Sequence, residues 1–177
     1  MVTILCLGTM IALFCHDAEA KEPSCSKRQA IYKMAEAMFY EARDQSYKGR
    51  VAVFYVIIQR IKDKRGIAAG SNTVCEVVDQ WGINKYTRRT VYQFSYHHLS
   101  KSRMRRIKKK EKAAWDATYK LAEYAYYHPK ELKKTGLTGQ NHYQTVKLWN
   151  SKKAPRYNKY AYNTKIIGDH IFFNLKK

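Results

Sequence analysis

The segment from Val51 to Ile61 constrains the fold more than any other part of the sequence. It lies in a predicted helix over about residues 49–62, and its apolar side chains cover nearly all of the helix surface. A helix that is apolar all round is stable in water only when other elements pack around it. We therefore expect this helix at the centre of a domain.

Three further helices are predicted from the helical spacing of apolar residues and from capping side chains. They span about residues 24–41, 72–78 and 101–126. Ser24 or Ser26 can cap the first of them, and Asn72 or Thr73 can cap the second. The long third helix has an apolar stripe that should face the interior of the domain.

The later part of the chain predicts strands. Residues 141–146 and 165–173 are rich in β-branched and aromatic side chains, and each predicts one short strand. Residues 79–99 show no clear period, and we expect a long, ordered, functional loop there. The predicted fold class is therefore α+β, a mostly helical domain with a small late β-sheet.

Residues 1–20 have the form of an export signal. Residues 1–15 are nearly all apolar, and Ala18-Glu19-Ala20 resembles a signal-peptidase site, although no Lys or Arg precedes the apolar run. We expect cleavage after Ala20 and one domain over residues 21–177, secreted or held in the periplasm or cell wall. A buried N-terminal helix and a membrane anchor are the alternatives.

The two cysteines that cleavage would leave are Cys25 and Cys75. An exported chain with two cysteines is typical of one disulfide. Two separate buried thiols are the alternative, because free cysteine is often simply buried.

The chain is strongly basic, with a net charge of +20. A field of this strength attracts polyanions, among them nucleic acid, anionic membrane and anionic cell wall. Seven bases gather on the third long helix: Arg103, Arg105, Arg106, Lys108, Lys109, Lys110 and Lys112. Only Glu111 opposes them there, so we expect contact with anionic cell-wall polymers; a merely solvated helix face is the alternative.

Glu41 is the candidate catalytic residue. It closes an apolar helix in the string Phe39-Tyr40-Glu41. A carboxyl group among aromatic and apolar neighbours loses solvation and is more easily protonated, as a glycosidase acid must be. From this chemistry alone, a glutamate paired with Arg43 or Arg60 is the simpler interpretation.

Four sequence blocks favour the catalytic interpretation of Glu41 over the ion-paired one. They are Tyr40-Glu41-Ala42-Arg43-Asp44-Gln45-Ser46 with Gly49 and Arg60 downstream, then Asn72–Val78, then Gln93–Tyr96, and finally Asn141–Tyr143 with Trp149 and Ile167–Phe172 downstream. In this order, over about residues 30–173, the chain resembles the SleB-like cell wall hydrolase family. That family is named for a spore-cortex-lytic enzyme and includes bacteriophage members.

The resemblance implies a lysozyme-like fold and cleavage of peptidoglycan between N-acetylmuramic acid and N-acetylglucosamine. It implies that Glu41 is the general acid. Characterised relatives are lytic transglycosylases, which close muramic acid onto its own C6 hydroxyl, and some members are described as amidases. The stretch Gln80–Tyr92 is longer than usual in the family, so we expect a different cleft there.

The number of carboxylates bears on the mechanism. A two-carboxylate hydrolase needs a second acid at about 5–9 Å from the first, and a transglycosylase needs only one. Asp44 can supply the second acid if the first helix continues past Glu41, and Asp169 and Glu76 are other options. Because no acid follows Glu41 at a fixed family position, the one-carboxyl route is favoured.

The predicted substrate-binding residues are Tyr143, His142, Phe94, Ser95 and His170. Tyr143 has the strongest case, because tyrosine can hydrogen-bond sugar hydroxyls and stack on a ring. Phe94 can equally be core, and His170 a buried histidine with satisfied hydrogen bonds. Arg43 is expected to hold a neighbouring carboxyl or backbone group.

Two rival functions remain. In a zinc-dependent N-acetylmuramoyl-L-alanine amidase, His97, His98, His142 and His170 would supply metal ligands, but compact zinc-ligand spacing is absent. A basic nucleic-acid-binding protein would fit the charge and the 15 tyrosines, but no known binding motif occurs. We expect an enzyme without cofactor or metal, without a specific nucleic-acid partner, and monomeric.

Overall fold

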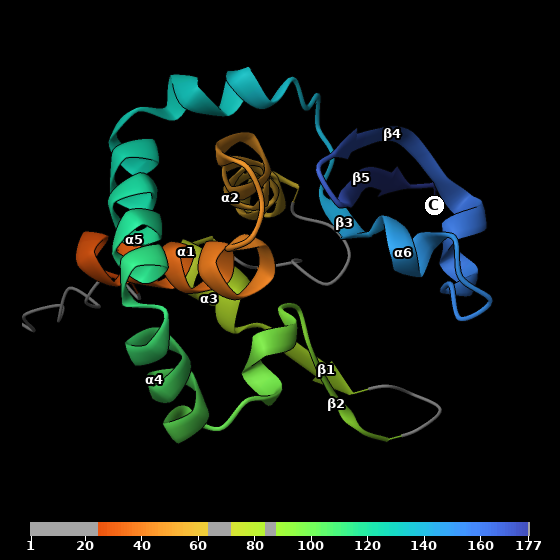
Figure 1. Ribbon diagram of the computed structural model, residues 1–177. Helices are drawn as coiled ribbons and strands as arrows, with labels where there is room; N and C mark the ends of the chain where they lie inside the picture. The colour runs from red at the N-terminus through yellow and green to blue at the C-terminus, as the bar shows by residue number, and fades with distance from the viewer. Residues whose placement is uncertain (1–24, 64–71, 84–87, 177) are drawn as a thin grey trace, which may run out of the picture.

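The computed structural model describes residues 25–63, 72–83 and 88–176 (Figure 1). The predicted signal peptide, residues 1–20, and the domain boundary after it lie outside these residues. The chain is a mostly helical α+β domain with small antiparallel sheets, so the predicted fold class is confirmed. Within the described residues, no helix is long and apolar enough to cross a membrane.

Helix α2 (Tyr47–Lys62) occupies the centre, as predicted. It begins after the N-cap Ser46, and every residue from Val51 to Ile57 is buried. Four elements pack against it: helices α1 (Lys27–Ala42), α3 (Val74–Asp79) and α5 (Lys112–Tyr127) and the 3₁₀ helix η3 (Pro129–Thr135). Figure 1 looks nearly along its axis, with these elements arranged around it. The central helix thereby fixes where the elements that carry the site can lie.

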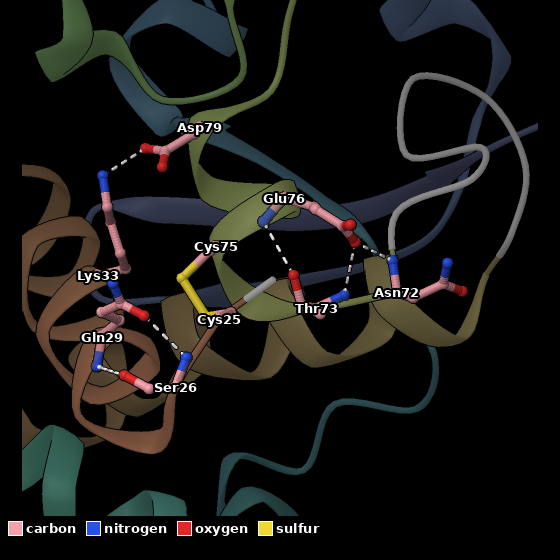
Figure 2. The surroundings of a disulfide bond; sticks show 9 residues. All are labelled: Cys25, Ser26, Gln29, Lys33, Asn72, Thr73, Cys75, Glu76 and Asp79. Carbon is pink, nitrogen blue, oxygen red and sulfur yellow. Dashed lines mark hydrogen bonds and ion pairs between the residues drawn. A yellow bond between two sulfur atoms is a disulfide. The ribbon is translucent and has the colours of Figure 1, made fainter. Parts of the chain in front are cut away.

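Helix α1 (Lys27–Ala42) carries Glu41 in its last turn. Ser26 is its N-cap and forms a capping box with Gln29, so the second of the two predicted caps is used (Figure 2). The helix ends at Ala42, and the next residues form a turn. Its buried side packs on α2 and α5.

Helix α3 (Val74–Asp79) begins after Thr73, which forms a capping box with Glu76. A disulfide joins Cys75 in its first turn to Cys25 beside the start of α1 (Figure 2). The disulfide prediction is therefore confirmed, and the alternative of two separate thiols is wrong. The bond ties together two elements that both pack on α2.

The predicted loop over residues 79–99 is wrong for much of its length. Strands β1 (Trp81–Ile83) and β2 (Thr90–Tyr92) form an antiparallel hairpin, in which Trp81 faces Tyr92. A 3₁₀ helix, η2 (Ser95–His98), follows it. Strands of three residues are too short to show an alternating pattern, and cross-strand pairing holds them together.

The predicted single helix over residues 101–126 is two helices. Helix α4 (Lys101–Lys110) and helix α5 (Lys112–Tyr127) meet at Glu111, whose backbone is not helical (φ −111°, ψ 40°). Helix α5 buries an apolar stripe against α1, whereas no residue of α4 is buried. Seven of the ten residues of α4 are basic. Because α4 buries no apolar face, packing does not force it to continue the axis of α5.

The late sheet has the order β3-β5-β4, with strands β3 (His142–Thr145), β4 (Ala161–Ile167) and β5 (His170–Leu175). Helix α6 (Val146–Trp149) and the 3₁₀ helix η4 (Arg156–Tyr160) lie between β3 and β4 in the chain. The first predicted strand is confirmed. The second is wrong, because Gly168 adopts a positive φ of 57° and turns the chain back between β4 and β5.

Candidate active site

Glu41 is half-buried at the C-terminal end of α1. The backbone N–H and the hydroxyl of Ser95 both donate hydrogen bonds to Glu41 Oε1, and each donor–acceptor distance is 2.9 Å. Ser95 opens η2 directly after the β1–β2 hairpin. Two donors on one oxygen hold the carboxyl group in one orientation, which suits a group that transfers protons.

Tyr143 approaches Glu41 from strand β3. Burial raises the pKa of Tyr143 well above its usual value, and the charge of Glu41 and a side-chain hydrogen bond to Glu41 raise it further. The nearby Arg60 guanidinium opposes this shift. Tyr143 is therefore a protonated donor near neutral pH, and it joins Ser95 in contacting Glu41.

Arg60 lies behind this pair as a buried cation. Its Nε donates to the carbonyl oxygen of Asn141 at 2.9 Å, and its guanidinium lies 5.4 Å from the ring centre of Phe94. Burial lowers the pKa of Arg60, while the charges of Tyr143 and Glu41 raise it. Its buried Nη1 has no hydrogen-bond partner within the described part of the chain. The guanidinium thus places positive charge beside Glu41.

Phe94 is fully buried. Its ring lies beneath the Arg60 guanidinium and near Tyr96, 6.3 Å between ring centres. Among the predicted substrate-binding residues it therefore supports the site from the core. Ser95, the next residue, is exposed and reaches Glu41 directly.

His170 lies beside Tyr143, with 5.5 Å between ring centres. Burial lowers the pKa of His170, and the charges of Glu41, Asp44 and Asp169 oppose this shift. Its buried Nδ1 has no partner among the residues that the structure describes. A neutral imidazole at this place can donate or accept a hydrogen bond toward a sugar.

His142 precedes Tyr143 on β3, so its side chain lies on the other face of the strand. Its ring stacks on Phe173 at 5.5 Å, and Nδ1 is 2.5 Å from Asn141 Oδ1. Burial, followed by the charge of Arg60, lowers the pKa of His142 to about 4, against the opposing charge of Asp63. The structure thus groups Glu41 with Ser95, Tyr143 and His170 and places His142 behind them.

Arg43 pairs with Glu111 at 2.7 Å between Nε and Oε2. It therefore holds a neighbouring carboxyl group, and that group belongs to the junction of α4 and α5. Tyr40 Oη also donates to the carbonyl oxygen of Met104 at 2.9 Å. These contacts fasten the basic helix to the end of α1 that carries Glu41.

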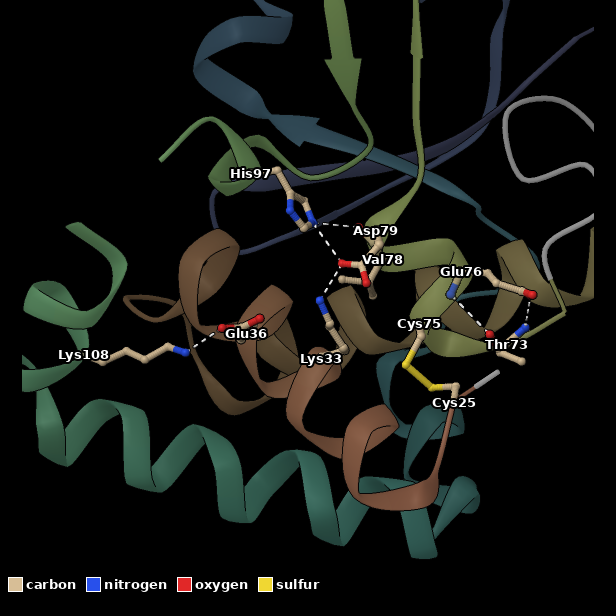
Figure 3. Close-up of polar contacts among 10 residues, drawn as sticks. All are labelled: Cys25, Lys33, Glu36, Thr73, Cys75, Glu76, Val78, Asp79, His97 and Lys108. Carbon is tan, nitrogen blue, oxygen red and sulfur yellow. Dashed lines mark hydrogen bonds and ion pairs between the residues drawn. A yellow bond between two sulfur atoms is a disulfide. The ribbon is translucent and has the colours of Figure 1, made fainter. Parts of the chain in front are cut away.

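A third contact strengthens this attachment. Lys108 of α4 pairs with the buried Glu36 of α1 at 2.6 Å (Figure 3). The ammonium group also donates to Tyr32 Oη at 2.7 Å and lies 4.1 Å from the ring centre of Trp115. Lys108 is one of the seven bases in the predicted polyanion surface, but its ammonium group contacts α1 and α5 and is not directed to a polyanion.

The three candidates for a second acid lie in different places. Because α1 ends at Ala42, Asp44 is not carried on a continuing helix. Gln45 Nε2 donates to Asp169 Oδ2 at 3.0 Å and to Asp44 Oδ1 at 3.4 Å, so both acids lie near one amide. Glu76 serves the capping box of α3.

The rival metal site was predicted from four histidines. His97 Nε2 lies 2.8 Å from the carbonyl oxygen of Val78 and 3.7 Å from Asp79 (Figure 3). Within residues 25–63, 72–83 and 88–176, no three His, Cys, Asp or Glu side chains gather in a way that could hold a metal ion.

In the sequence, Arg60 is a possible partner for Glu41 and part of the first sequence block, without a predicted role in the site. The signal that marks it is its position, because this arginine lies within the apolar segment from Val51 to Ile61 of the central helix. A charged side chain in such a place must find polar partners inside the fold. Arg60 Nε donates to the Asn141 carbonyl oxygen, and the guanidinium charge interacts with Tyr143 and Glu41.

A family model described as Cell Wall Hydrolase matches residues 44–173. The match covers 130 of the 177 residues and includes Arg60, Ser95, Tyr143 and His170. It begins three residues after Glu41. No curated protein and no solved structure matched the chain, so the predicted lysozyme-like relationship stays a prediction.

Proposed function

The chain belongs to the cell wall hydrolase family and acts on peptidoglycan, and we propose that it is a lytic transglycosylase. In this proposal it cuts the glycan strand between N-acetylmuramic acid and N-acetylglucosamine. Glu41 serves as both acid and base. The observation that carries the proposal is the double hydrogen bond from Ser95 to Glu41 Oε1, with Tyr143 as a further donor.

The first step transfers a proton from Glu41 to the glycosidic oxygen. The bond between C1 and that oxygen breaks, and its electron pair goes to the oxygen. Glu41 is then a carboxylate, and the Ser95 and Tyr143 donors stabilise the charge that has developed on it. The buried guanidinium of Arg60 adds positive charge at the same place.

The second step takes the proton back. The C6 hydroxyl oxygen of the muramic acid forms a bond to C1, and its proton goes to the Glu41 carboxylate. The product is a 1,6-anhydro sugar, and no water is consumed. Ring closure within one sugar competes well with attack by water, because the reacting atoms are already held together.

A two-carboxylate hydrolase is the second candidate. It is favoured by one observation, that the charges of Glu41, Asp44 and Asp169 all act on His170. A water held by His170 and activated by one of these aspartates would then attack C1. Asp44 and Asp169 are the candidates for the second acid, and both lie beside the side-chain amide of Gln45.

Mass spectrometry of the products from purified peptidoglycan separates these mechanisms. We expect ends that carry 1,6-anhydromuramic acid, which are one water lighter than reducing ends. Reducing muramic acid ends would mean the two-carboxylate route. Free stem peptides with intact glycans would mean an amidase and would contradict the proposal.

We also propose that the exposed bases of α4 attract anionic cell-wall polymers. Arg103, Arg105 and Arg106 are exposed, and α4 is fastened to the end of α1 that carries Glu41. Charge in this position draws the polymer toward Glu41 without touching the bond that breaks. A short neutral glycan gains nothing from it.

The remaining proposal concerns the compartment. We propose that residues 1–20 are removed as a signal peptide and that the enzyme acts outside the cytoplasm. The disulfide between Cys25 and Cys75 supports this, because such bonds persist in oxidising compartments. N-terminal sequencing of protein recovered from the envelope or medium should begin at Lys21.

A further inference from the structure

A pocket of about 580 Å³ lies between α1 and α5. Each helix contributes two pairs of neighbouring residues, one turn apart: Arg28, Gln29, Tyr32 and Lys33 from α1, and Trp115, Asp116, Tyr119 and Lys120 from α5. None of these residues takes part in the contacts of Glu41. The volume is in the range of pockets that bind small ligands.

The walls of the pocket are aromatic. Tyr32 meets Trp115 edge to face at 5.6 Å between ring centres, and Trp115 lies 6.1 Å from Tyr119. Tyr32 is 41% exposed although its ring is fixed from below by Lys108. Exposed rings that are already held in place suit stacking on the apolar face of a sugar, because little freedom is lost on binding.

The rim of the pocket is basic. The lining contains three basic residues, Arg28, Lys33 and Lys120, and one acidic residue, Asp116. Asp116 is already paired with Lys112. Lys33 is paired with Asp79 (Figure 2). Arg28 and Lys120 form no ion pair within the described residues. Cations that pair with no described carboxylate, beside aromatic walls, complement a sugar that carries a carboxylate.

The pocket lies on the far side of α1 from Glu41. Nine residues separate Tyr32 from Glu41 on one helix, which is two and a half turns, or about 13 Å along the axis. The two side chains therefore leave the helix in opposite directions. A ligand in the pocket is consequently not part of the glycan that lies against Glu41.

We propose that this pocket is a second peptidoglycan-binding site, which holds an N-acetylmuramic acid of a neighbouring strand whose lactyl carboxylate carries no stem peptide. The inference rests on the family's substrate and not on the role of Glu41. Binding two strands of one network raises the effective concentration of each site for the other. The pocket then strengthens attachment to the insoluble polymer and leaves the chemistry on short soluble glycans unchanged.

The test uses the full chain with Arg28→Gln and Lys120→Gln together. Both side chains are exposed, so the fold is expected to persist. A control with Lys130→Gln and Lys152→Gln removes the same charge from exposed positions outside the pocket. Binding is measured on purified peptidoglycan freed of phosphate-bearing polymers, and turnover is measured on short soluble glycans.

We expect the pocket variant to bind the polymer about tenfold more weakly than the control, with equal turnover on the soluble glycans. Tyr119→Leu should weaken binding in the same way, since it removes a stacking ring and keeps an apolar side chain. Equal binding by the pocket and control variants would overturn the proposal. So would binding that requires the phosphate-bearing polymers.

A monovalent probe gives a second readout. N-acetylmuramic acid should change the fluorescence of Trp115, and N-acetylglucosamine, which lacks the carboxylate, should do so only at higher concentration. The pocket variant should lose this preference. The same response from both sugars would contradict the basic rim as the source of specificity. None of these readouts depends on which product the enzyme forms, so failure of the proposed mechanism would show separately.

Discussion

Helix α1 is held at its two ends in different ways. Its N-terminal end is attached through the Cys25–Cys75 disulfide and a capping box within five residues of chain. Its C-terminal end is held by polar contacts with distant residues: Tyr40 donates to the Met104 carbonyl oxygen, Ser95 donates to Glu41, and Arg43 pairs with Glu111. The covalent end gives stability, whereas the polar end arranges groups that can exchange protons. Changes at the two ends should therefore affect different measurements.

The largest effect is expected from Glu41→Gln at the polar end. The amide keeps the shape of the side chain and removes the transferable proton, so wall lysis should fall by about 10²–10⁴-fold or more. The melting temperature should change little. A folded variant that lyses walls at a comparable rate would show that another residue is the acid.

Removing the disulfide should lower the stability of the fold and leave the catalytic rate nearly unchanged, the opposite of what is expected for Glu41→Gln. The bond closes a loop of about 50 residues, and Cys25→Ser with Cys75→Ser should lower the free energy of unfolding by about 2–4 kcal/mol. The rate on soluble glycans, measured well below the melting temperature, should stay close to that of the original protein. A large loss of rate in the folded variant would mean that the two ends of α1 are coupled.

Ser95→Ala isolates one contact of the polar end. The variant keeps the backbone N–H bond to Glu41 and loses the hydroxyl bond, so we expect a loss of about 10–100-fold in kcat. Ser102→Ala, on the exposed face of α4, is the matched control. If both variants keep full activity, Ser95 only packs against the site.

His142, on the face of β3 that points away from Glu41, makes the stability of the fold sensitive to pH. Its folded pKa of about 4 lies below the ordinary value of 6.5, so protonation favours the unfolded chain. The stability that it contributes is present above pH 6.5 and is lost as the pH falls toward about 4. His142→Asn should flatten the fall in melting temperature between these values, whereas the exposed His128→Asn should not.

The smallest effect is expected from the outer face of α4. Replacing Arg103, Arg105 and Arg106 by Gln should weaken binding to whole walls about 3–10-fold, with unchanged turnover on short soluble glycans. Added salt should reproduce the effect, because screening shortens to about 8 Å at physiological ionic strength. Equal losses on both substrates would mean that α4 contacts the reacting sugars.

Local signals explain the predictions that were confirmed. The capping boxes at Ser26 and Thr73 and the apolar surface of α2 each depend on residues close in the chain. Two of the predictions that were wrong involve chain reversals. The hairpin of β1 and β2 and the turn at Gly168 depend on pairing between strands, which short segments do not reveal.

The sequence by itself determined the family, the central helix and the candidate glutamate at the end of α1. Only the tertiary structure brought Ser95, Tyr143 and Arg60 to Glu41 from three other elements and chose the disulfide over two thiols. It also left the α1–α5 pocket open on the opposite side of the same helix. The physical reason is that periodicity shows which face of an element is buried, whereas packing around α2 decides which residues meet there.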